Sequence, residues 1–391
     1  MYNPSEIFWA YRNKITNKLW GMVHMPARST IRHAHGRQKG IILISYITEP
    51  FTLAPWEKFS NFHTMYWECR EIARLFAEKG YASDIVSAEN LSFVPTKPYA
   101  FCIDVEDGLL RLSKHLPANC KKIFRILNPH WKAYNDAEQL RLDWLEKRRG
   151  VRLLPHRTRR PSQNAELADF LEGFGNKAVF GTFRQFNKPI FFVPISAVIH
   201  FDFPEKKDFA AAAEHFMWIG GGGAVLKGLD LCLEAFAKTP DLHLHVCGPI
   251  YGEKDFTDEY KKELEQTPNI HVYGRIDVGG EQFAKLIETC GAVIYPSGGE
   301  GTSGAIVQAM HAGLVPIITH ITGIQEDAGY IQLDDNPTPE SMVQAARDFS
   351  NMPPDEIRDL SKKIWGYARK TYTREEFSKA YRRFIEDVLK L

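Results

Sequence analysis

Apolar and polar positions along this chain form short buried runs separated by longer amphipathic stretches. Apolar runs of strand length occupy 40–46, 81–88, 122–129, 178–182 and 190–196, and then 215–219, 242–248, 269–274, 292–297 and 314–319. Helical spacing of apolar residues occupies 61–79, 104–116, 138–149, 228–238, 254–266, 280–289, 304–312 and 374–390. Because strands and helices alternate, the pattern predicts an α/β protein with parallel, doubly wound sheets.

The length of 391 residues exceeds what one ordinary core supports and predicts two domains. We expect a first domain at 40–201, a second at 202–373, and a final amphipathic helix at 374–391. Residues 1–39 are a basic, aromatic appendage with seven Lys or Arg and one acid. Such a segment can lie in a membrane interface or pack as a helix on its own domain, and the sequence leaves both interpretations open.

The net charge of +1 conceals two halves of opposite charge. Residues 1–200 hold 29 Lys and Arg against 18 Asp and Glu, whereas residues 201–391 hold 20 against 30. The basic half would suit an anionic partner such as a membrane surface, a lipid phosphate or an acidic glycan. The other interpretation is that the two halves attract each other. The basic run at 147–160 lacks interleaved aromatic residues, so we expect no nucleic-acid partner.

The sequence predicts neither a membrane span nor a secretory signal. No apolar run approaches the roughly 18 residues of a spanning helix, and the N-terminus lacks a secretory hydrophobic region. We therefore expect a cytoplasmic protein, with any membrane contact peripheral and at the inner face. The six cysteines lie far apart without a C-x-x-C pair, which favours reduced thiols in a core.

The segment 291–318 carries the strongest chemical signal. An apolar strand runs into a loop in which Gly298, Gly299, Gly301 and Gly304 surround Glu300, and a helix and a second strand follow. A glycine-rich turn between a strand and a helix points several backbone N–H groups and the positive helix end at one spot, which suits a phosphate. The carboxylate inside such a loop is suited to binding sugar hydroxyls.

Two further segments of the second half carry related signals. At 218–228 a strand runs into four glycines, and Lys227-Gly228 then opens a helix, which places a point charge where phosphate could bind. The spacing fits neither a Walker loop nor the G-x-G-x-x-G fingerprint. The strand at 269–274 ends in Gly274, and strand ends in open α/β sheets commonly line the ligand crevice.

Together these segments resemble the donor domain of GT-B-fold glycosyltransferases, specifically the retaining family 4, or group 1, transferases. The family pattern is a glycine turn before a Lys-Gly helix start, a strand ending in Val-x-Gly, and a Pro-Ser-x-x-Glu-Gly loop. The resemblance extends over about 192–391, whereas over 40–190 only the layout is similar. It implies two Rossmann-like domains facing across a cleft, the first binding acceptor and the second donor, with the final helix crossing back to the first domain.

The resemblance also implies roles for the matching residues. Lys227 would contact the donor diphosphate, and Glu300 would bind hydroxyls of the transferred sugar. The other expected donor-binding residues are Gly221, Gly222, Gly223, Gly274, Arg275, Ile276, Gly299, Gly301, Thr302, Ser303, Gly304 and Gln308. Among these, the N–H groups of 302–304 would hold the phosphates, the side chain at 308 would reach the ribose, and 275–276 would frame the base.

A histidine of the first domain completes the expected catalytic set. His130 follows the strand at 122–129, where the family often has a histidine facing the donor sugar, so we expect it near the anomeric centre. The alternative is a surface histidine after a proline turn. His63 is a second candidate of the same kind.

The activity implied is transfer of a sugar from a nucleoside-diphosphate donor, UDP or GDP first, to a glycan or lipid-linked acceptor in polysaccharide or glycolipid assembly. The enzyme would be of the hexosyltransferase type, with retention and without cofactor or metal. The nearest acidic string, D-V-E-D at 104–107, sits at a helix start and is suited to charging it.

The chain departs from the family pattern in three places, one of which is the loop after the first strand, where 47–63 lacks the usual Gly-Gly turn. Gln308 stands where Glu is usual, and the first glycine turn lacks the arginine that usually precedes the lysine. Two alternatives therefore stay open, an enzyme similar to nucleotide-sugar 2-epimerases and a non-catalytic nucleotide-sugar-binding scaffold.

Overall fold

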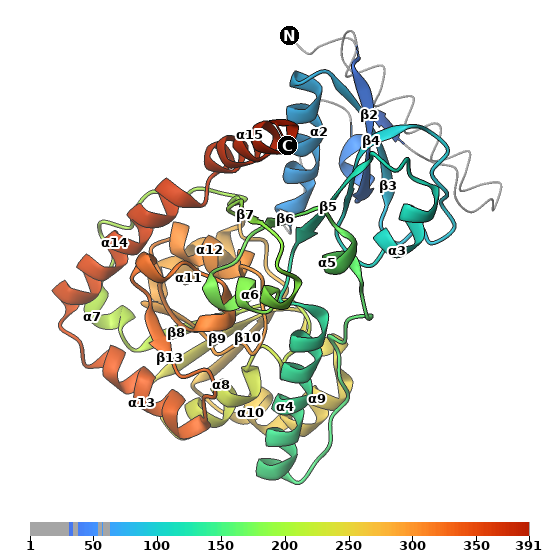
Figure 1. Cartoon of the computed structure of the whole chain (residues 1–391). Coiled ribbons are helices and arrows are strands. Elements are labelled where there is room, and N and C mark those ends of the chain that lie inside the picture. Colours follow the sequence, from blue (N-terminus) through green and yellow to red (C-terminus); the bar gives the residue numbers. More distant parts are fainter. Residues whose placement is uncertain (1–30, 34–37, 54–56, 58–62, 391) are drawn as a thin grey trace.

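The computed structural model describes residues 31–33, 38–53, 57 and 63–390, which form two α/β domains, each built on one sheet (Figure 1). The predicted fold class is confirmed. Most of the predicted N-terminal appendage lies outside the described residues. Its residues 31–33 form the short strand β1, which pairs antiparallel with the edge of the first sheet.

The first sheet is parallel except for that edge strand. Its spatial order is β1 (Ile31–His33), β3 (Tyr81–Ser87), β2 (Gly40–Tyr46), β4 (Tyr99–Asp104), β5 (Lys121–Ile126), β6 (Phe170–Gly173) and β7 (Ile190–Phe192). The helices of this half are α2 (Met65–Glu78), α3 (Leu109–Leu112), α4 (Trp131–Arg149), α5 (Asn164–Leu167) and α6 (Lys177–Gly181).

The second sheet is parallel throughout. Its order is β10 (Ile270–Gly274), β9 (His243–Cys247), β8 (His215–Ile219), β11 (Ala292–Tyr295), β12 (Val315–Thr319) and β13 (Ile331–Leu333). The chain leaves β8 toward β9 on one side and returns to pair β11 on the other. The carboxyl ends of β8 and β11 therefore form the topological switch point, where open α/β sheets bind ligands.

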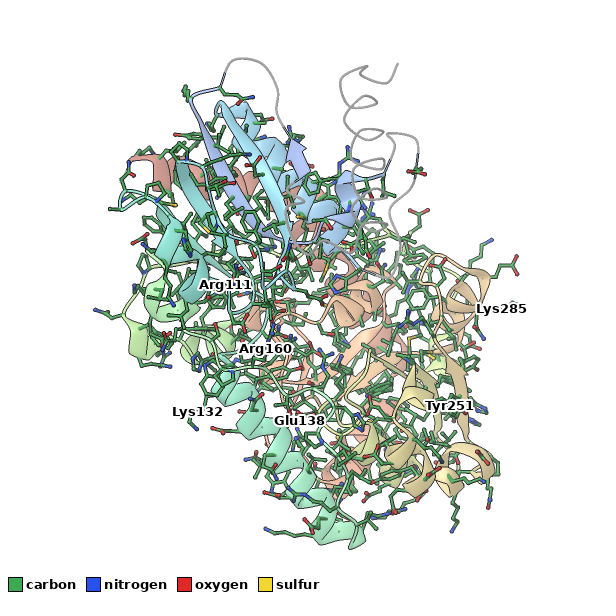
Figure 2. The ribbon with its side chains drawn as sticks, turned by 90° about the vertical axis from the view of Figure 1, so that its right-hand side faces the viewer. Arg111, Lys132, Glu138, Arg160, Tyr251 and Lys285 are labelled. Atoms are coloured by element: carbon green, nitrogen blue, oxygen red, sulfur yellow. The ribbon has the colours of Figure 1, made fainter. Side chains whose placement is uncertain are left out.

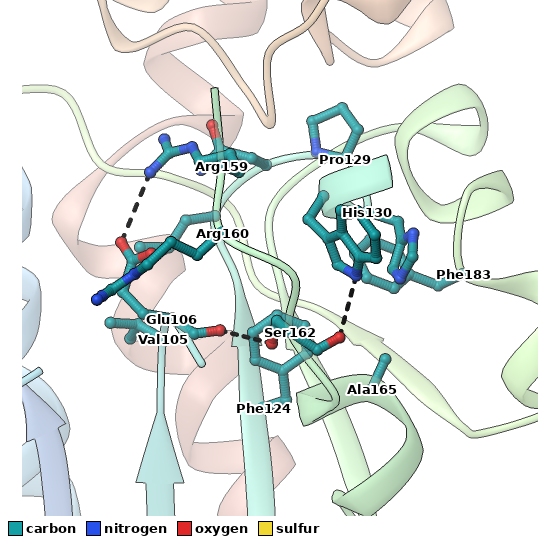
Figure 3. A pocket seen from close by; sticks show the side chains of 13 residues that line it. Val105, Glu106, Phe124, Pro129, His130, Arg159, Arg160, Ser162, Ala165 and Phe183 are labelled. Atoms are coloured by element: carbon teal, nitrogen blue, oxygen red, sulfur yellow. Dashed lines mark hydrogen bonds and ion pairs between the residues drawn. The ribbon is translucent and has the colours of Figure 1, made fainter. Parts of the chain in front are cut away.

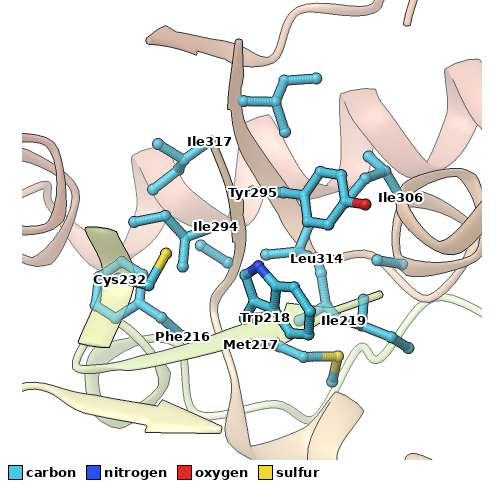
Figure 4. Close-up of a cluster of buried hydrophobic side chains, with 14 of the residues drawn as sticks. Phe216, Met217, Trp218, Ile219, Cys232, Ile294, Tyr295, Ile306, Leu314 and Ile317 are labelled. Atoms are coloured by element: carbon cyan, nitrogen blue, oxygen red, sulfur yellow. The ribbon is translucent and has the colours of Figure 1, made fainter. Parts of the chain in front are cut away.

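Helices cover both faces of this second sheet. They are α7 (Phe209–Ala212), α8 (Leu229–Phe236), α9 (Lys254–Glu259), α10 (Lys261–Gln266), α11 (Glu281–Thr289), α12 (Gly304–His311), α13 (Pro339–Ser350) and α14 (Pro354–Thr371). Short 3₁₀ turns occur at Glu49–Phe51, Ser113–His115, Arg184–Phe186, Ile250–Gly252, His320–Thr322 and Glu326–Ala328. The core of the second domain is continuous and aromatic at its centre, where Trp218 and Tyr295 are fully buried (Figure 4).

The last helix, α15 (Arg374–Lys390), lies beside α2 of the first domain (Figure 1). Its apolar stripe of Phe377, Tyr381, Phe384, Ile385 and Val388 is buried in the core of the first sheet. The spacing of these residues at three and four positions puts them on one helical face, which is why the amphipathic pattern was readable from sequence.

Several elements of the first half differ from the sequence prediction, and the strand β4 at Tyr99–Asp104 is one that the pattern did not predict. Residues 178–182 were expected as a strand, but α6 occupies 177–181, because the side chain of Asn176 caps it by accepting from the N–H groups of Ala178 and Val179. The expected helix at 104–116 is the end of β4 followed by the one-turn helix α3. The strand β6 went unpredicted. Short apolar runs fit a strand and a buried helix equally well, so periodicity alone could not separate them.

Helix α4 lies between β5 and β6 of the first sheet in sequence but packs against α8, α9 and α10 of the second domain (Figure 1). Ion pairs hold it there: Arg148 contacts Asp230 and Glu234, and Arg149 contacts Glu259 and Glu263. The interpretation that the two halves attract each other thus accounts for part of the charge asymmetry. All six cysteines are buried and unpaired, as their spacing predicts.

Candidate active site

Lys227 and Glu300 meet at the switch point of the second sheet. Lys227 ends the loop after β8, and Glu300 lies in the loop after β11, the neighbouring strand. Lys227 Nζ lies 3.2 Å from Glu300 Oε1, and the two side chains are only 8% and 13% exposed. The two loops that the sequence analysis singled out therefore lie side by side in the structure.

Glu300 is held as a carboxylate. Burial opposes its charge, but Lys227, the hydroxyl of Tyr295 and the charge of Arg157 outweigh burial and lower the pKa of Glu300. The Tyr295 hydroxyl donates to Glu300 Oε1 at 2.7 Å. An ionised carboxylate accepts hydrogen bonds and does not act as a proton donor near neutral pH, which suits it to binding hydroxyl groups.

Close contact between the two loops fixes Lys227. Its carbonyl accepts from Trp218 Nε1 at 3.2 Å. The next residue, Gly228, has φ +69°, and a Cβ there would lie 2.5 Å from Pro296 of the second loop. Only glycine combines this left-handed conformation with this approach, so the Lys-Gly pair sets the distance between the loops.

A carboxylate of the chain itself binds the first glycine turn, whose Gly221, Gly222 and Gly223 the sequence analysis expects to contact the donor. Both carboxylate oxygens of Glu253 accept from this turn, one from the N–H of Gly223 and the other from the N–H of Ala224 at 3.0 Å. Glu253 is 6% exposed, so a buried carboxylate already uses two backbone N–H groups of this turn. Gly222 lies beside the same carboxylate, whereas Gly221 faces Lys227 Nζ.

The first half of the chain packs directly onto the second glycine loop. A Cβ at Gly301 would lie 2.2 Å from the carbonyl oxygen of Leu127, and one at Gly299 would lie 3.1 Å from the ring of Tyr134 on α4. These two glycines therefore permit close approach between the domains. Arg141 of α4 adds a hydrogen bond to the carbonyl of Pro296 at 3.0 Å.

The predicted phosphate-binding N–H groups lie at the start of α12. Thr302 and Ser303 are each 5% exposed, and the N–H of Ser303 donates to the carbonyl of Thr322 at 3.2 Å. The side chain of Thr302 donates to the carbonyl of Gly323. Ser303 can therefore offer its N–H to a phosphate only if that backbone contact opens. Gly304 is the first residue of α12, where the positive end of the helix dipole lies.

Gln308 is paired with the segment that joins the domains. Its Oε1 accepts from the N–H of Ile199 at 3.1 Å, and its Nε2 donates to the carbonyl of the same residue at 2.7 Å. The side chain is 2% exposed. In this arrangement both ends of the amide are used, so the expected ribose contact would require the Ile199 pair to separate.

The end of β10 is open, as a base-binding edge would require. Gly274 has φ +69° and no atom within 4 Å of where a Cβ would lie, Arg275 is exposed, and Ile276 is 8% exposed. A glycine also directly follows each of the strands β8 and β9, at Gly220 and Gly248. Sequence reasoning gave Gly248 no role, although its position directly after a strand was the available signal.

His130 lies in a different place from the Lys227–Glu300 pair. It lines a pocket at the carboxyl ends of β4 and β5 (Figure 3). Its ring packs among Phe183, Phe186 and Trp131, and its Nε2 is buried without a hydrogen-bond partner in the described chain. Burial lowers the pKa of His130, and the charges that act on it are those of Glu166 and Lys132.

Of the two candidate histidines, His63 is the one whose pKa is affected by the charges of Lys227 and Glu300. Desolvation by the surrounding protein lowers the pKa of His63. The charge of Lys227 lowers it further, whereas Glu68 and Glu300 raise it. Its side chain is exposed, and its Nδ1 accepts from the N–H of Met65 at 3.3 Å. The sequence analysis puts His130 first and His63 second, but the distance of each histidine to the second domain depends on how the domains pack.

The described residues contain little that suggests another kind of site. No group of three His, Cys, Asp or Glu side chains there has metal-binding geometry, and metal independence stays a prediction. Asp104 of the D-V-E-D string accepts from the N–H of Gly108 at the start of α3, as expected. Among the described helices, none is both long and apolar enough to cross a membrane.

The second half of the chain is similar in sequence to a known protein family, and the whole chain is similar in fold to solved structures. Residues 213–351 match the family model for glycosyl transferases group 1. No curated protein matches the chain. Sucrose-phosphate synthase from Thermosynechococcus elongatus has a similar structure, with a TM-score of 0.61 and 14% identity over 90% of this chain and 100% of that one. HepE from Anabaena, solved with UDP and glucose, gives 0.57 and 10% over 90% and 100%.

Two further structures extend the comparison. WaaG, a glycosyltransferase involved in lipopolysaccharide biosynthesis, gives a TM-score of 0.51 and 14% identity over 87% of this chain and 98% of that one. The match to TarM, with a TM-score of 0.50, spans 53% of the TarM chain, about half of its length. Residues 213–351 are therefore similar to a group 1 glycosyl transferase domain, and the chain as a whole shares the GT-B fold of these structures.

Proposed function

We propose that this protein is a glycosyltransferase that moves a sugar from a nucleoside-diphosphate donor to a hydroxyl of a glycan or lipid-linked acceptor. The observation that carries the proposal is the Lys227–Glu300 pair, 3.2 Å apart within the group 1 domain. The pair sets a cation for a leaving diphosphate beside a carboxylate for sugar hydroxyls, at the switch point of the sheet.

The chemistry follows from these two charges. When the bond between the anomeric carbon and the phosphate oxygen breaks, its electron pair stays with the diphosphate, and the sugar gains oxocarbenium character. Lys227 and the positive end of α12 would stabilise the leaving group, and Glu300 would orient the sugar. Front-face attack, with the leaving phosphate accepting the acceptor's proton, would retain the anomeric configuration and need no metal.

The pocket around His130 is a suitable acceptor site. Leu127 lines it and also touches Gly301, so the pocket adjoins the second glycine loop. The buried Nε2 of a neutral His130 can exchange a hydrogen bond with a sugar hydroxyl. A glycan or glycolipid acceptor, a UDP or GDP donor, and contact with the inner membrane face complete the proposal. The UDP bound to HepE favours testing UDP first.

A thermal-shift panel tests the donor. UDP, GDP, ADP, dTDP and CMP, each with and without its common sugars, would be compared in Mg²⁺ and in EDTA. A ligand at 100 times its dissociation constant adds about 2.7 kcal/mol to stability. A clear shift from one nucleoside diphosphate in EDTA supports the proposal. If no nucleotide shifts the unfolding temperature of protein shown to be folded, the proposal is contradicted.

Variants then test the site. Lys227→Ala should lower transfer by about 10²-fold to 10³-fold, because a leaving-group contact is lost. Lys238→Ala is the matched control, since Lys238 pairs with Glu340 on the exposed surface. Glu300→Gln keeps an acceptor for Tyr295 and removes the charge, and it should also impair transfer. Free or isomerised sugar without any acceptor would point to an epimerase instead, and binding without turnover to a scaffold.

A further inference from the structure

The basic run at 147–160 contains one arginine that differs from the others. Five of its arginines each have a carboxylate within ion-pair distance: Arg148, Arg149, Arg152, Arg159 and Arg160. Arg157 has none within 4.0 Å in the part of the chain that the structure describes. Its side-chain hydrogen-bond partner is a neutral hydroxyl, that of Tyr134, which accepts from Arg157 Nε at 3.2 Å.

The backbone around Arg157 is firmly anchored to α4. The buried carboxylate of Glu138 accepts from the N–H of Arg157 at 2.7 Å and from the N–H of His156 at 2.9 Å. Its other oxygen accepts from the Thr158 hydroxyl at 3.3 Å. Figure 2 shows Glu138 on the side of α4 that faces the second domain, away from Lys132. The position of Arg157 is thus set by a helix and not by a free loop.

The Arg157 side chain lies across the first glycine turn. A Cβ at Gly223 would lie 2.2 Å from Arg157 Cγ and 2.8 Å from its Cδ, so glycine is needed there for the arginine to pass. Its hydrogen-bond partner Tyr134 packs on Gly299 of the second loop. Arg157 and Tyr134, two hydrogen-bonded side chains from the first half of the chain, therefore connect the two glycine-rich loops of the donor domain.

Two carboxylates near Arg157 both have other partners, so its positive charge is not neutralised by a direct ion pair in the described residues. Arg157 and Lys227 both act on the carboxylate of Glu300 and lower its pKa. Lys227 forms the direct ion pair with Glu300, whereas Arg157 does not. The other carboxylate at this turn, Glu253, is taken up by the N–H groups of Gly223 and Ala224. The guanidinium of Arg157 is therefore a cation beside the site that lacks a carboxylate of its own.

We propose that Arg157 is a donor-binding residue, the second cation for the diphosphate of the nucleotide sugar, supplied from outside the donor domain's own glycine turn. The inference rests on the proposed function. It gives the diphosphate a cation on either side, with Lys227 from the second half and Arg157 from the segment after α4. It also explains how a turn without an arginine of its own can serve a doubly charged leaving group.

Affinity for paired nucleotides tests the inference. The dissociation constants of the nucleoside diphosphate that the wild type binds and of the matching monophosphate are measured by calorimetry for wild type, Arg157→Gln, Arg157→Lys and Arg152→Gln. Arg157→Gln should weaken the diphosphate about 10-fold to 100-fold and the monophosphate far less, because a charge-assisted contact to the second phosphate is lost. Arg157→Lys should recover part of the loss. Arg152, paired with Asp143 and Glu146 on the surface, is the matched control and should change nothing.

Each other result has a definite meaning. Equal weakening of both nucleotides by Arg157→Gln would show that Arg157 only orders the loops, and an unchanged diphosphate affinity would show that it does not touch the ligand. Either result overturns the inference and leaves the proposed function intact, provided Lys227→Ala weakens the diphosphate. A wild type that binds no nucleoside diphosphate overturns both. An unfolding midpoint for Arg157→Gln equal to that of the wild type excludes misfolding as the cause of the loss.

Discussion

Glu253 offers the sharpest test of how the first glycine turn is stabilised. Its two carboxylate oxygens accept from the buried N–H groups of Gly223 and Ala224. Glu253→Ala leaves both donors unsatisfied, and each buried unsatisfied group costs about 1–3 kcal/mol. The variant should therefore lose about 2–6 kcal/mol, a large share of the roughly 5–15 kcal/mol that stabilises a typical domain.

Two measurements follow this loss. The first is urea unfolding of wild type, Glu253→Ala and Glu253→Gln, with Glu265→Ala as the control because Glu265 is exposed on α10. Glu253→Gln should lose about half as much as Glu253→Ala, because its amide oxygen still accepts from one N–H. The second is amide hydrogen exchange, which should accelerate at Gly223 and Ala224 in the alanine variant.

Chemical rescue separates a filled anion site from simple packing. Formate carries the same carboxylate group without the side chain, so it should restore part of the stability of Glu253→Ala and leave the wild type unchanged. The reasoning is refuted if Glu253→Ala unfolds within about 0.5 kcal/mol of the wild type. It is also refuted if formate and chloride act alike at equal ionic strength.

Two further predictions concern the cores. Arg125 is fully buried and forms ion pairs with Glu68 at 3.0 Å and Glu172 at 2.7 Å. Arg125→Met leaves both carboxylates unpaired and should lower the free energy of unfolding in urea by about 3–5 kcal/mol. Adding Glu68→Gln and Glu172→Gln should recover most of this loss. His215 and His245 share a hydrogen bond on the second sheet, and burial together with nearby histidines lowers their pKa to about 4 and about 3 from 6.5. Because the unfolded chain binds these protons first, stability should be constant above pH 6.5 and fall below it, by up to about 1.4 kcal/mol per pH unit for the buried His245. His245→Gln should flatten that slope, and an unchanged slope in the variant would contradict the assignment.

The second half of the chain was largely predictable because its signals are local. Glycines before Lys227 and around Glu300 mark loops at strand ends, and the apolar strands beside them have the length and composition of a buried parallel sheet. The first half was harder. Residues 177–181 read as a strand until Asn176 is seen to cap a helix, and the one-turn helix α3 is too short for periodicity to identify.

The sequence by itself determined which residues could carry the chemistry: a lysine, a glutamate and two glycine-rich loops at the ends of neighbouring strands. Tertiary structure alone decided what surrounds them. Glu253 accepts from the N–H of Gly223 in the first glycine turn. Glu138 of α4 holds the backbone of Arg157, whose side chain then packs on Gly223. The two contacts on Gly223 join residues 30 and 66 positions apart in the chain. Strand and loop patterns are set by neighbouring residues, whereas such contacts are set by how whole elements pack, which leaves no local mark in the sequence.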